Sequence, residues 1–453
     1  MSGENSKIDS FKALIKLSLP AVMQQLMGTL LQYVDTAMVG HLGEAATASV
    51  STSTTVNWLI HSIPYGLTVG LLSTLSQAAG RGDGREMKRL AAMGSRLSLW
   101  LGLVLTAICL GISPFLPTWM QAAKEIRQPA SAYFFMVSIP LVFSVTGSMF
   151  ASALHAVKDT RTPMIINLSA NALNVVLNYL LIYCASLGVM GAAYATAIST
   201  ALCGVGMFVA FRHKGALRFG QEDYFNIDRG RLWKLLRVGL PVTATSAVSC
   251  SGYIVFAGMV SGMGVTTFAA HSIAVTAEEI FYLPGYGIRT ASSALIGSAI
   301  GEGNRGKFRN TRRQSLLVTA AVMTLSGLIL FFAAYPLMKL FTSSEPVALI
   351  GAKVLRIVAF SEPFFGLMVA WEGISYGTGR TRSVFIIEAL SMWGVRILFT
   401  FLVIRAGMGL TAVWWCMIAD NVTKAVLLTL VGLRQNEKHL FAEKSIQTQE
   451  VCL

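Results

Sequence analysis

The chain has 453 residues, of which 54% are hydrophobic and only 13% are charged, with a net charge of +14. Soluble proteins carry roughly a quarter charged residues, so this composition excludes an ordinary soluble domain. The excess positive charge does not point to a nucleic-acid partner, because the basic residues fall in alternate connections between apolar stretches. We therefore expect a chain embedded in a lipid bilayer, without a nucleic-acid partner.

Apolar stretches of about 20 residues recur along the chain, and each is long enough to cross a bilayer as a helix. Barrel strands would alternate apolar and polar residues, whereas residues 99–116 and 316–333 are apolar on all sides. We expect an all-α membrane protein with twelve transmembrane helices. The expected spans are residues 13–39, 46–77, 90–114, 130–155, 163–184, 188–211, 236–260, 266–298, 314–336, 348–374, 382–404 and 408–432.

Basic residues concentrate in every second connection between these spans. The segments 81–89, 214–234 and 305–313 are basic, as are the turns at 158–161 and 380–382. Cytoplasmic loops are enriched in Lys and Arg, so this alternation predicts that both termini lie in the cytoplasm. The first span lacks a clean cleavage site, and we interpret it as an uncleaved anchor.

The two halves of the chain align without a gap at a constant shift of 221 residues. Because each half has six helices, both enter the membrane from the same side as parallel repeats, and transporters built in this way alternate access around a site between the repeats. The matched pairs are Pro20 and Pro241, Met38 and Met259, Tyr65 and Tyr286, Gly80 and Gly301, Thr160 and Thr381, and Gly188 and Gly409. The duplication predicts an N-lobe (residues 1–212), a cytoplasmic linker (213–235), a C-lobe (236–433) and a polar cytoplasmic tail (434–453).

Ionisable residues inside apolar spans are functional candidates, because each costs at least about 2.5 kcal/mol in the bilayer core. Asp35 is the strongest, since its repeat partner is Phe256 and general packing would not need the acid. Burial disfavours a charged carboxylate, so Asp35 could bind and release a proton, hold Na⁺ or pair with a cationic substrate. Asn174 and Asn178 project from one face of the fifth span, and Thr196 follows in the sixth.

Further charged residues lie in the second half. Glu278 matches Asn57 in the repeat, so we expect these two polar groups to face one another across the lobes and to bind substrate. Glu362, which precedes Pro363, is expected at a bend in the tenth span. The charged residues of the last two spans have spacings that suit pairing, and we interpret them as structural. They are Glu388, Arg396, Asp420 and Lys424.

Short motifs occur in a fixed order along the chain: residues 34–43 (VDTAMVGHLG), 80–84 (GRGDG), 159–163 (DTRTP), 269–271 (AAH) and 301–305 (GEGNR). Together they resemble the multidrug and toxic compound extrusion (MATE) family over roughly residues 10–435. Residues 246–251 (SAVSCS) lack the acid of the NorM-like branch, and Glu278 shortly precedes residues 283–285 (LPG). In these features the chain resembles the DinF-like branch.

The resemblance implies a V-shaped fold of two six-helix lobes that exports organic cations or drugs in exchange for H⁺ or Na⁺. It also implies an N-lobe cation site, able to hold Na⁺, at Asp35, Asn174, Asn178 and Thr196. Some members have a second acid where this chain has Asn178. Hard cations prefer charged and carbonyl oxygens, so this departure should weaken Na⁺ binding and leaves H⁺ coupling open.

The expected partners are small organic cations and the bilayer, with no cofactor besides the coupling ion. We expect a monomer in a bacterial inner membrane. A lipid-linked oligosaccharide flippase of a related superfamily is the alternative, although its phosphate-bearing substrate would call for a cavity rich in Arg and Lys. An enzyme is not expected, because the sequence shows no metal-ligand cluster, no His-rich motif and no nucleophile–base pair.

Overall fold

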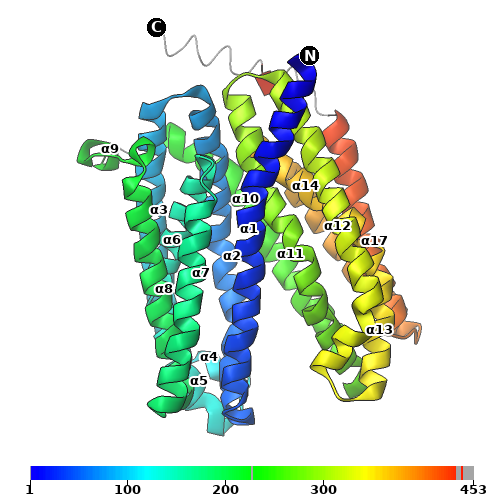
Figure 1. The fold of residues 1–453 in the computed structure, drawn as a ribbon. Coiled ribbons are helices and arrows are strands. Elements are labelled where there is room, and N and C mark those ends of the chain that lie inside the picture. The colour runs from blue at the N-terminus through cyan, green and yellow to red at the C-terminus, as the bar shows by residue number, and fades with distance from the viewer. Residues whose placement is uncertain (1, 226–227, 435–439, 442–453) are drawn as a thin grey trace. The chain divides into compact units, whose positions relative to one another are not determined.

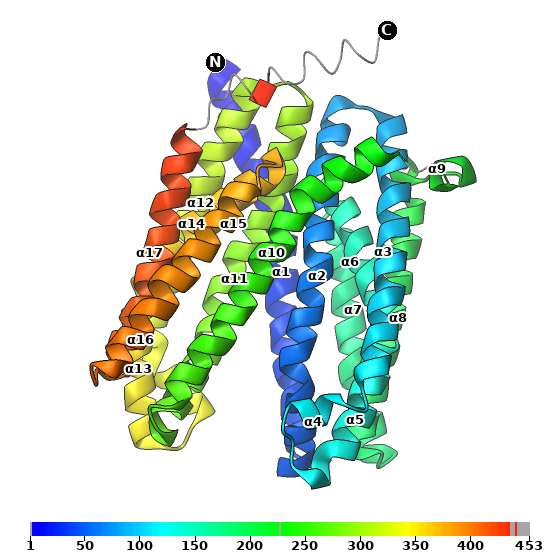
Figure 2. The ribbon, with the colours of Figure 1, turned by 180° about the vertical axis from the view of Figure 1, so that it is seen from behind.

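The computed structural model describes residues 2–225, 228–434 and 440–441, and its regular elements in these ranges are all helices (Figure 1). In the N-terminal half they are α1 (Ser2–Gly40), α2 (Glu44–Arg81), α3 (Gly84–Ile112), α4 (Leu116–Trp119), α5 (Lys124–Ser138), α6 (Leu141–Ala156), α7 (Arg161–Asn178), η1 (Tyr179–Cys184), α8 (Gly188–His213), η2 (Gly215–Leu217) and α9 (Gln221–Phe225). In the C-terminal half they are α10 (Arg229–Ser261), α11 (Val265–Gly301), α12 (Arg305–Phe341), α13 (Glu345–Ala359), α14 (Glu362–Thr378), α15 (Arg382–Ser391), η3 (Met392–Ile397), α16 (Leu398–Arg405) and α17 (Leu410–Arg434), many of which are seen from behind in Figure 2.

The described helices account for the twelve predicted spans. Eight are long and apolar enough to cross a membrane, and two more spans are the bent pairs α5–α6 and α13–α14. The remaining two, α2 and α11, have 38 and 37 residues, which is ample for a span, but they are more polar than the others. These two repeat-related helices carry Asn57 and Glu278.

The fourth and tenth spans are bent rather than straight, by 42° and 54°. Pro140 precedes α6 and Pro363 lies in the first turn of α14. Proline cannot donate a backbone hydrogen bond and clashes with the preceding turn, which explains both breaks. The bend predicted near Glu362 is therefore confirmed.

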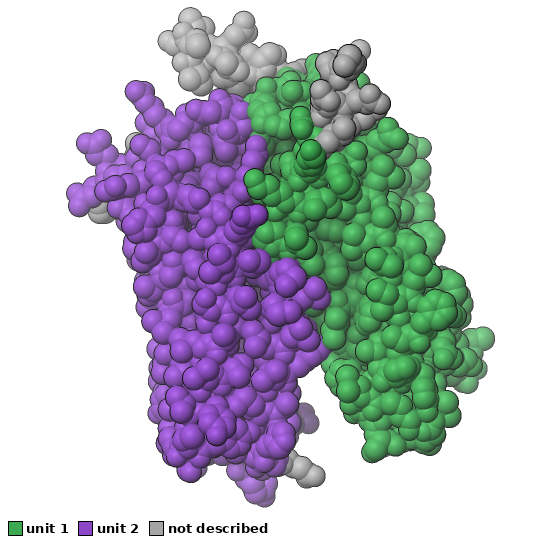
Figure 3. Space-filling view, in the orientation of Figure 1, with its two compact units in different colours: residues 1–22, 244–453 green, residues 23–243 purple. Residues whose placement is uncertain are grey.

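Contacts divide the protein into two units, coloured separately in Figure 3: Met1–Val22 with Ala244–Leu453, and Met23–Thr243. We call them the C-unit and the N-unit. The divisions fall inside α1 and α10, two residues after the matched prolines Pro20 and Pro241 and again 221 residues apart. The first half of α1 thus packs with the C-unit and the first half of α10 with the N-unit. The lobe boundaries predicted from the repeat stay a prediction.

Glycines allow these crossing segments to pack closely. In the N-unit, a Cβ atom at Gly66 would overlap the Thr243 side chain and the Gly239 carbonyl oxygen of α10. In the C-unit, a Cβ atom at Gly287 would lie 2.6 Å from the Val22 backbone nitrogen of α1. Gly66 matches Gly287 and Thr243 matches Val22 at the repeat shift, so the duplication has preserved one helix–helix contact in both units.

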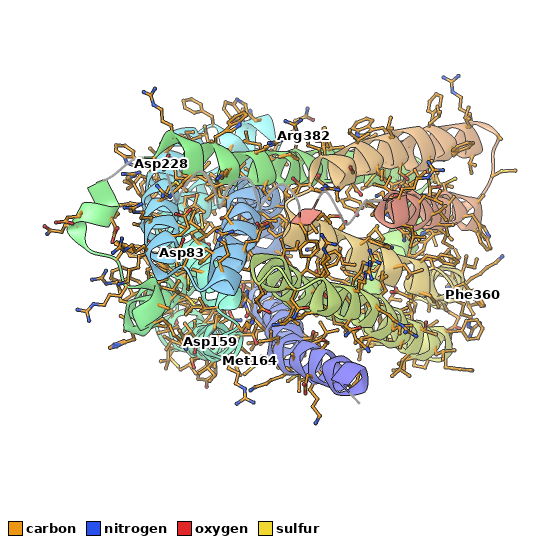
Figure 4. All side chains as sticks on the ribbon, turned by 90° about the horizontal axis from the view of Figure 1, so that it is seen from above. Asp83, Asp159, Met164, Asp228, Phe360 and Arg382 are labelled. Carbon is orange, nitrogen blue, oxygen red and sulfur yellow. The ribbon has the colours of Figure 1, made fainter. Side chains whose placement is uncertain are left out.

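Several basic connections of the N-unit are tied together at one end, where Figure 4 labels Asp83, Asp159 and Asp228. Lys214 pairs with Asp159 at 2.5 Å, and Arg231 pairs with Glu86 at 2.8 Å. The Lys214 connection and the 81–89 turn therefore belong to the same end of this unit, as the charge pattern requires. That this end faces the cytoplasm stays a prediction.

Asp159 is held as a carboxylate at this end. Burial on its own would raise the pKa of the Asp159 carboxyl. The Lys214 ammonium and the two hydrogen bonds from Thr162 outweigh burial and hold the pKa below its usual range. The turn between α6 and α7 is thereby fixed to the segment that follows α8.

Candidate cation site and buried charges

The four residues predicted to form a cation site lie together in the N-unit. The Asn178 amide donates to the Asp35 carboxylate and also, at 3.2 Å, to Asn174 Oδ1. The Asn174 amide in turn donates to Thr196 Oγ1 at 3.4 Å. Helices α1, α7 and α8 thus contribute one continuous chain of polar groups, and their role in ion binding stays a prediction.

Asn178 presents an acceptor without a donor. Its side chain is fully buried, and among the described atoms its Oδ1 has no hydrogen-bond partner. A buried carbonyl oxygen normally has a partner, and leaving it without one costs about 1–3 kcal/mol. This oxygen belongs to the same amide that donates to Asp35, so the cluster combines a carboxylate with an unused oxygen ligand.

Local backbone geometry presents these residues. Asn174 and Asn178 are one helical turn apart on α7, and the helix widens into the π-helical segment η1 immediately after Asn178. Such π segments are frequent at functional sites.

Tyr133 of α5 is a neighbour that the sequence reasoning missed. It is 7% exposed and close enough to Asp35 for the two to interact electrostatically. Its repeat partner is Val354, so the loss of symmetry that singled out Asp35 could also have identified it.

The C-unit lacks an equivalent of this cluster. The residues that match Asp35, Asn174, Asn178 and Thr196 at the repeat shift are Phe256, Val395, Phe399 and Met417. Phe256 and Met417 belong to the main apolar core of the C-unit. The predicted cation site is therefore a feature of one unit alone.

The C-unit instead holds a network of charges that the sequence reasoning interpreted as structural. Arg396 Nε donates to Asp420 at 2.8 Å, and Lys424 pairs with Glu388 at 2.8 Å and with Asp420 at 3.0 Å. The pairing of Asp420 with Lys424 along α17 follows the predicted spacing. Arg396 and Glu388 each pair with α17. The π-helical segment η3 carries Arg396.

Hydroxyl groups and aromatic rings complete this network. Ser249 donates to Glu388 at 2.6 Å and Ser391 donates to Asp420 at 2.6 Å. The Arg396 guanidinium lies 5.3 Å from the centre of the Tyr253 ring. A further buried pair joins Arg289 of α11 to Glu372 of α14 at 2.6 Å.

Besides Asp35, the two other predicted substrate ligands, Glu278 and Asn57, belong to different units. Glu278 is 8% exposed in α11 of the C-unit, and Asn57 is partly exposed in α2 of the N-unit. That they face one another and bind substrate stays a prediction.

Comparison with known proteins identifies the family. The MatE family model matches residues 20–180 and again residues 241–402, so each half carries one copy of the repeat. The probable multidrug resistance protein NorM of Thermotoga maritima is 28% identical over 436 residues, which cover 93% of this chain and 92% of that protein. The probable multidrug resistance protein YpnP of Bacillus subtilis is 24% identical over 404 residues, with 86% and 88% covered.

Solved structures share the fold. A structure described as MATE in the bent conformation aligns with a TM-score of 0.89 at 22% identity, covering 98% of this chain and 99% of that one. An outward-facing multidrug resistance MATE family transporter of the MOP superfamily aligns with a TM-score of 0.88 at 22% identity, covering 96% of each chain. The predicted helical fold built from a duplicated six-helix repeat is confirmed. The chain is a member of the MatE family of multi-pass membrane transporters, the MATE family that its motifs resemble.

Proposed function

We propose that the protein exports organic cations, including drugs, in exchange for H⁺ or Na⁺. The observation that carries this proposal is the Asp35 cluster. The Asn178 amide nitrogen donates to the Asp35 carboxylate, while the oxygen of the same amide has no hydrogen-bond partner among the described atoms. A proton on Asp35 could donate to that oxygen, and a Na⁺ ion could bind both groups. The relatives named as multidrug resistance proteins support the substrate class, and those names do not favour the flippase alternative.

Exchange follows if the ion and the cationic substrate compete for the same negative charge. An ion arriving at Asp35 from outside neutralises the carboxylate and weakens its attraction for the bound organic cation. Release of the ion on the other side restores the charge for the next substrate. A repeat-built transporter needs only this differential binding to couple the two movements.

We favour H⁺ over Na⁺ as the coupling ion at this site. The cluster offers a single carboxylate, whereas tight oxygen sites for hard cations use several charged or carbonyl ligands. The acid-free segment 246–251 and Glu278 ahead of residues 283–285 support placement in the DinF-like branch. The proposal includes a monomeric protein in a bacterial inner membrane with both termini in the cytoplasm.

The test is efflux of a fluorescent organic cation from proteoliposomes under an imposed pH gradient and, separately, a Na⁺ gradient. Wild type, Asp35→Asn and Glu345→Gln are measured side by side, because Glu345 pairs with Lys339 at the exposed start of α13 and serves as a matched carboxylate control. We expect one gradient to drive wild type and the control while Asp35→Asn is inactive. Ion-driven efflux by Asp35→Asn, or no response of wild type to either gradient, would overturn the proposal.

A further inference from the structure

The segments that follow the last helix of each repeat occupy matching positions in the chain. Helix α8 ends at His213 and α17 ends at Arg434, which are 221 residues apart. Helices α3 and α12 also begin at matching residues, Gly84 and Arg305. The linker after α8 and the tail after α17 are therefore equivalent parts of the duplicated sequence.

In the N-unit, the linker lies against α3. Its short helices η2 and α9 both pack on α3. Arg96 Nη1 of α3 donates to the Tyr224 carbonyl oxygen at 2.7 Å. The Phe219 ring lies 6.0 Å from the Phe211 ring, near the end of α8, and stacks on the Tyr224 ring at 5.9 Å. The linker thus bridges α8 and α3.

In the C-unit, the described part of the tail lies on α12, the repeat equivalent of α3. The Phe441 ring meets the Phe308 ring edge-on, with the ring centres 5.8 Å apart. The Arg305 guanidinium lies 5.5 Å from the centre of the Phe441 ring, within the range of a cation–π contact. Leu440, which matches Phe219 of the linker, is 8% exposed. An apolar pair within the predicted polar tail is therefore packed against the C-unit.

Phe308 occupies a place where an aromatic ring needs a cover. It is 1% exposed although it lies in the first turn of α12 beside exposed residues such as Arg305. A large apolar side chain in such a polar turn is buried only if other groups cover it. The Phe441 ring and the Arg312 guanidinium, 5.7 Å from the centre of the Phe308 ring, contribute to that cover. The repeat partner Met87 is 7% exposed, so both units keep a buried apolar residue at this position.

We propose that Leu440 and Phe441 form a strap that holds the start of α12, as the linker holds α3 in the N-unit. The duplicated unit then consists of six helices and the segment that follows them. The family model matches residues 20–180 and 241–402, which include neither the linker nor the tail. The strap is therefore not implied by membership of the family.

A strap at this place helps the C-unit to move as one body. Helix α12 packs against α11, α13 and α14, so fixing its first turn steadies one end of this group. Transporters built from repeats alternate access largely by rigid-body rocking of one half against the other. Loss of the strap should lower the maximal transport rate and leave the half-saturation concentration unchanged, because the strap lies outside the candidate cation site. This effect rests on the proposed function, whereas the docking does not.

The first experiment compares the thermal midpoints of purified wild type, Phe441→Ala, Phe308→Ala and the double variant. Each single variant should lower the midpoint, and the double variant should lower it by less than the sum of both shifts, because the two residues share one contact. Leu433→Ala, at a position 66% exposed near the end of α17, is the matched control and should equal wild type. Additive shifts, or a Phe441→Ala midpoint equal to wild type, would overturn the strap.

Hydrogen exchange locates the effect in the chain. Amides in the first two turns of α12 should exchange faster in Phe441→Ala than in wild type, because the strap no longer opposes local opening. Amides at the start of α3, which the linker holds, are the internal control and should not change. Equal acceleration in both helices would show general loosening and would overturn the assignment.

Efflux from proteoliposomes tests the role in transport. Phe441→Ala should show a lower maximal rate than wild type and Leu433→Ala, with the same half-saturation concentration for the fluorescent cation. A maximal rate equal to wild type would overturn the role of the strap in transport. If no ion gradient drives wild-type efflux, the proposed function fails, while the midpoints and the exchange rates still decide whether the strap exists.

Discussion

Replacing Asn178 with Asp should convert the N-unit site into a much tighter cation site. The Asn178 amide is in hydrogen-bond contact with Asp35, so the new carboxylate would face the old one. At a separation of about 4 Å and an effective dielectric constant of about 20, two unit charges repel by about 4 kcal/mol. A bound proton or Na⁺ relieves that repulsion, so we expect its affinity to rise by up to about a thousandfold.

The assay is thermal unfolding of purified protein across a series of Na⁺ concentrations, with K⁺ replacing Na⁺ at constant ionic strength. A ligand that binds only the folded state stabilises it in proportion to the logarithm of its concentration over Kd. The Na⁺ midpoint for Asn178→Asp should therefore fall far below that of wild type. The matched control is Asn167→Asp, which places the same charge on α7 where Asn167 bonds to Pro163 and Cys203. Equal Na⁺ dependence in both variants and wild type would refute the geometry.

Three smaller predictions concern stability. Gly66→Ala should lower the free energy of unfolding by about 1–3 kcal/mol, and with it the thermal midpoint, because the added methyl would overlap α10. The control Gly28→Ala, which has open space around the added methyl, should leave the midpoint unchanged. Equal midpoints for the two variants would contradict the close crossing. Because the pKa of Asp159 is lowered in the fold, the stability from its Lys214 pair is present above about pH 4 and lost as pH falls below it, and Asp159→Asn should flatten an acid unfolding curve over that range. Asp420→Ala removes the acid that pairs with Arg396, while Lys424 keeps its pair with Glu388. Leaving this one buried positive charge without its acid should lower the free energy of unfolding by about 3–5 kcal/mol, so a chemical unfolding curve matching wild type would show that the pair is not buried in the native protein.

Much of the fold could be predicted because lipid imposes a simple rule. Each span must be long, apolar and helical, and this alone locates the spans. The helices extend beyond the apolar stretches, as in α12, which begins at Arg305 rather than at the expected residue 314. The duplication was visible because matched glycines and prolines occupy positions that only those residues tolerate, such as Gly66 and Gly287 at the helix crossings. The bends at residues 139–140 and 360–361 were harder, since hydropathy does not register a change in helix direction.

The candidate site was predictable where symmetry failed. Asp35 stood out against Phe256, and Asn174 and Asn178 shared a helical face. Tyr133 was missed, although its repeat partner is Val354, because an aromatic residue in an apolar helix is usually an ordinary core residue.

Interhelical pairing in the C-unit could not be predicted from spacing. Sequence separation relates residues of one helix, so the pairing of Asp420 with Lys424 was accessible. Arg396 and Glu388 share a span eight residues apart, yet both bond to α17. The π-helical segment η3, which has no recognised sequence signal here, contributes to this arrangement by carrying Arg396.

The two repeats share their packing but differ in the charged residues that they carry. Two copies of one six-helix unit have kept the same crossing contact at Gly66 and Gly287, but they have not kept the same charges. The polar cluster around Asp35 in the N-unit holds one carboxylate among amides, whereas the C-unit holds a network of paired charges. A symmetric scaffold needs only packing to be preserved, while directional exchange requires each half to bind its ligand differently. Because a buried charge is costly wherever it is not needed, the positions at which the repeats disagree in charge are those where function should be sought first.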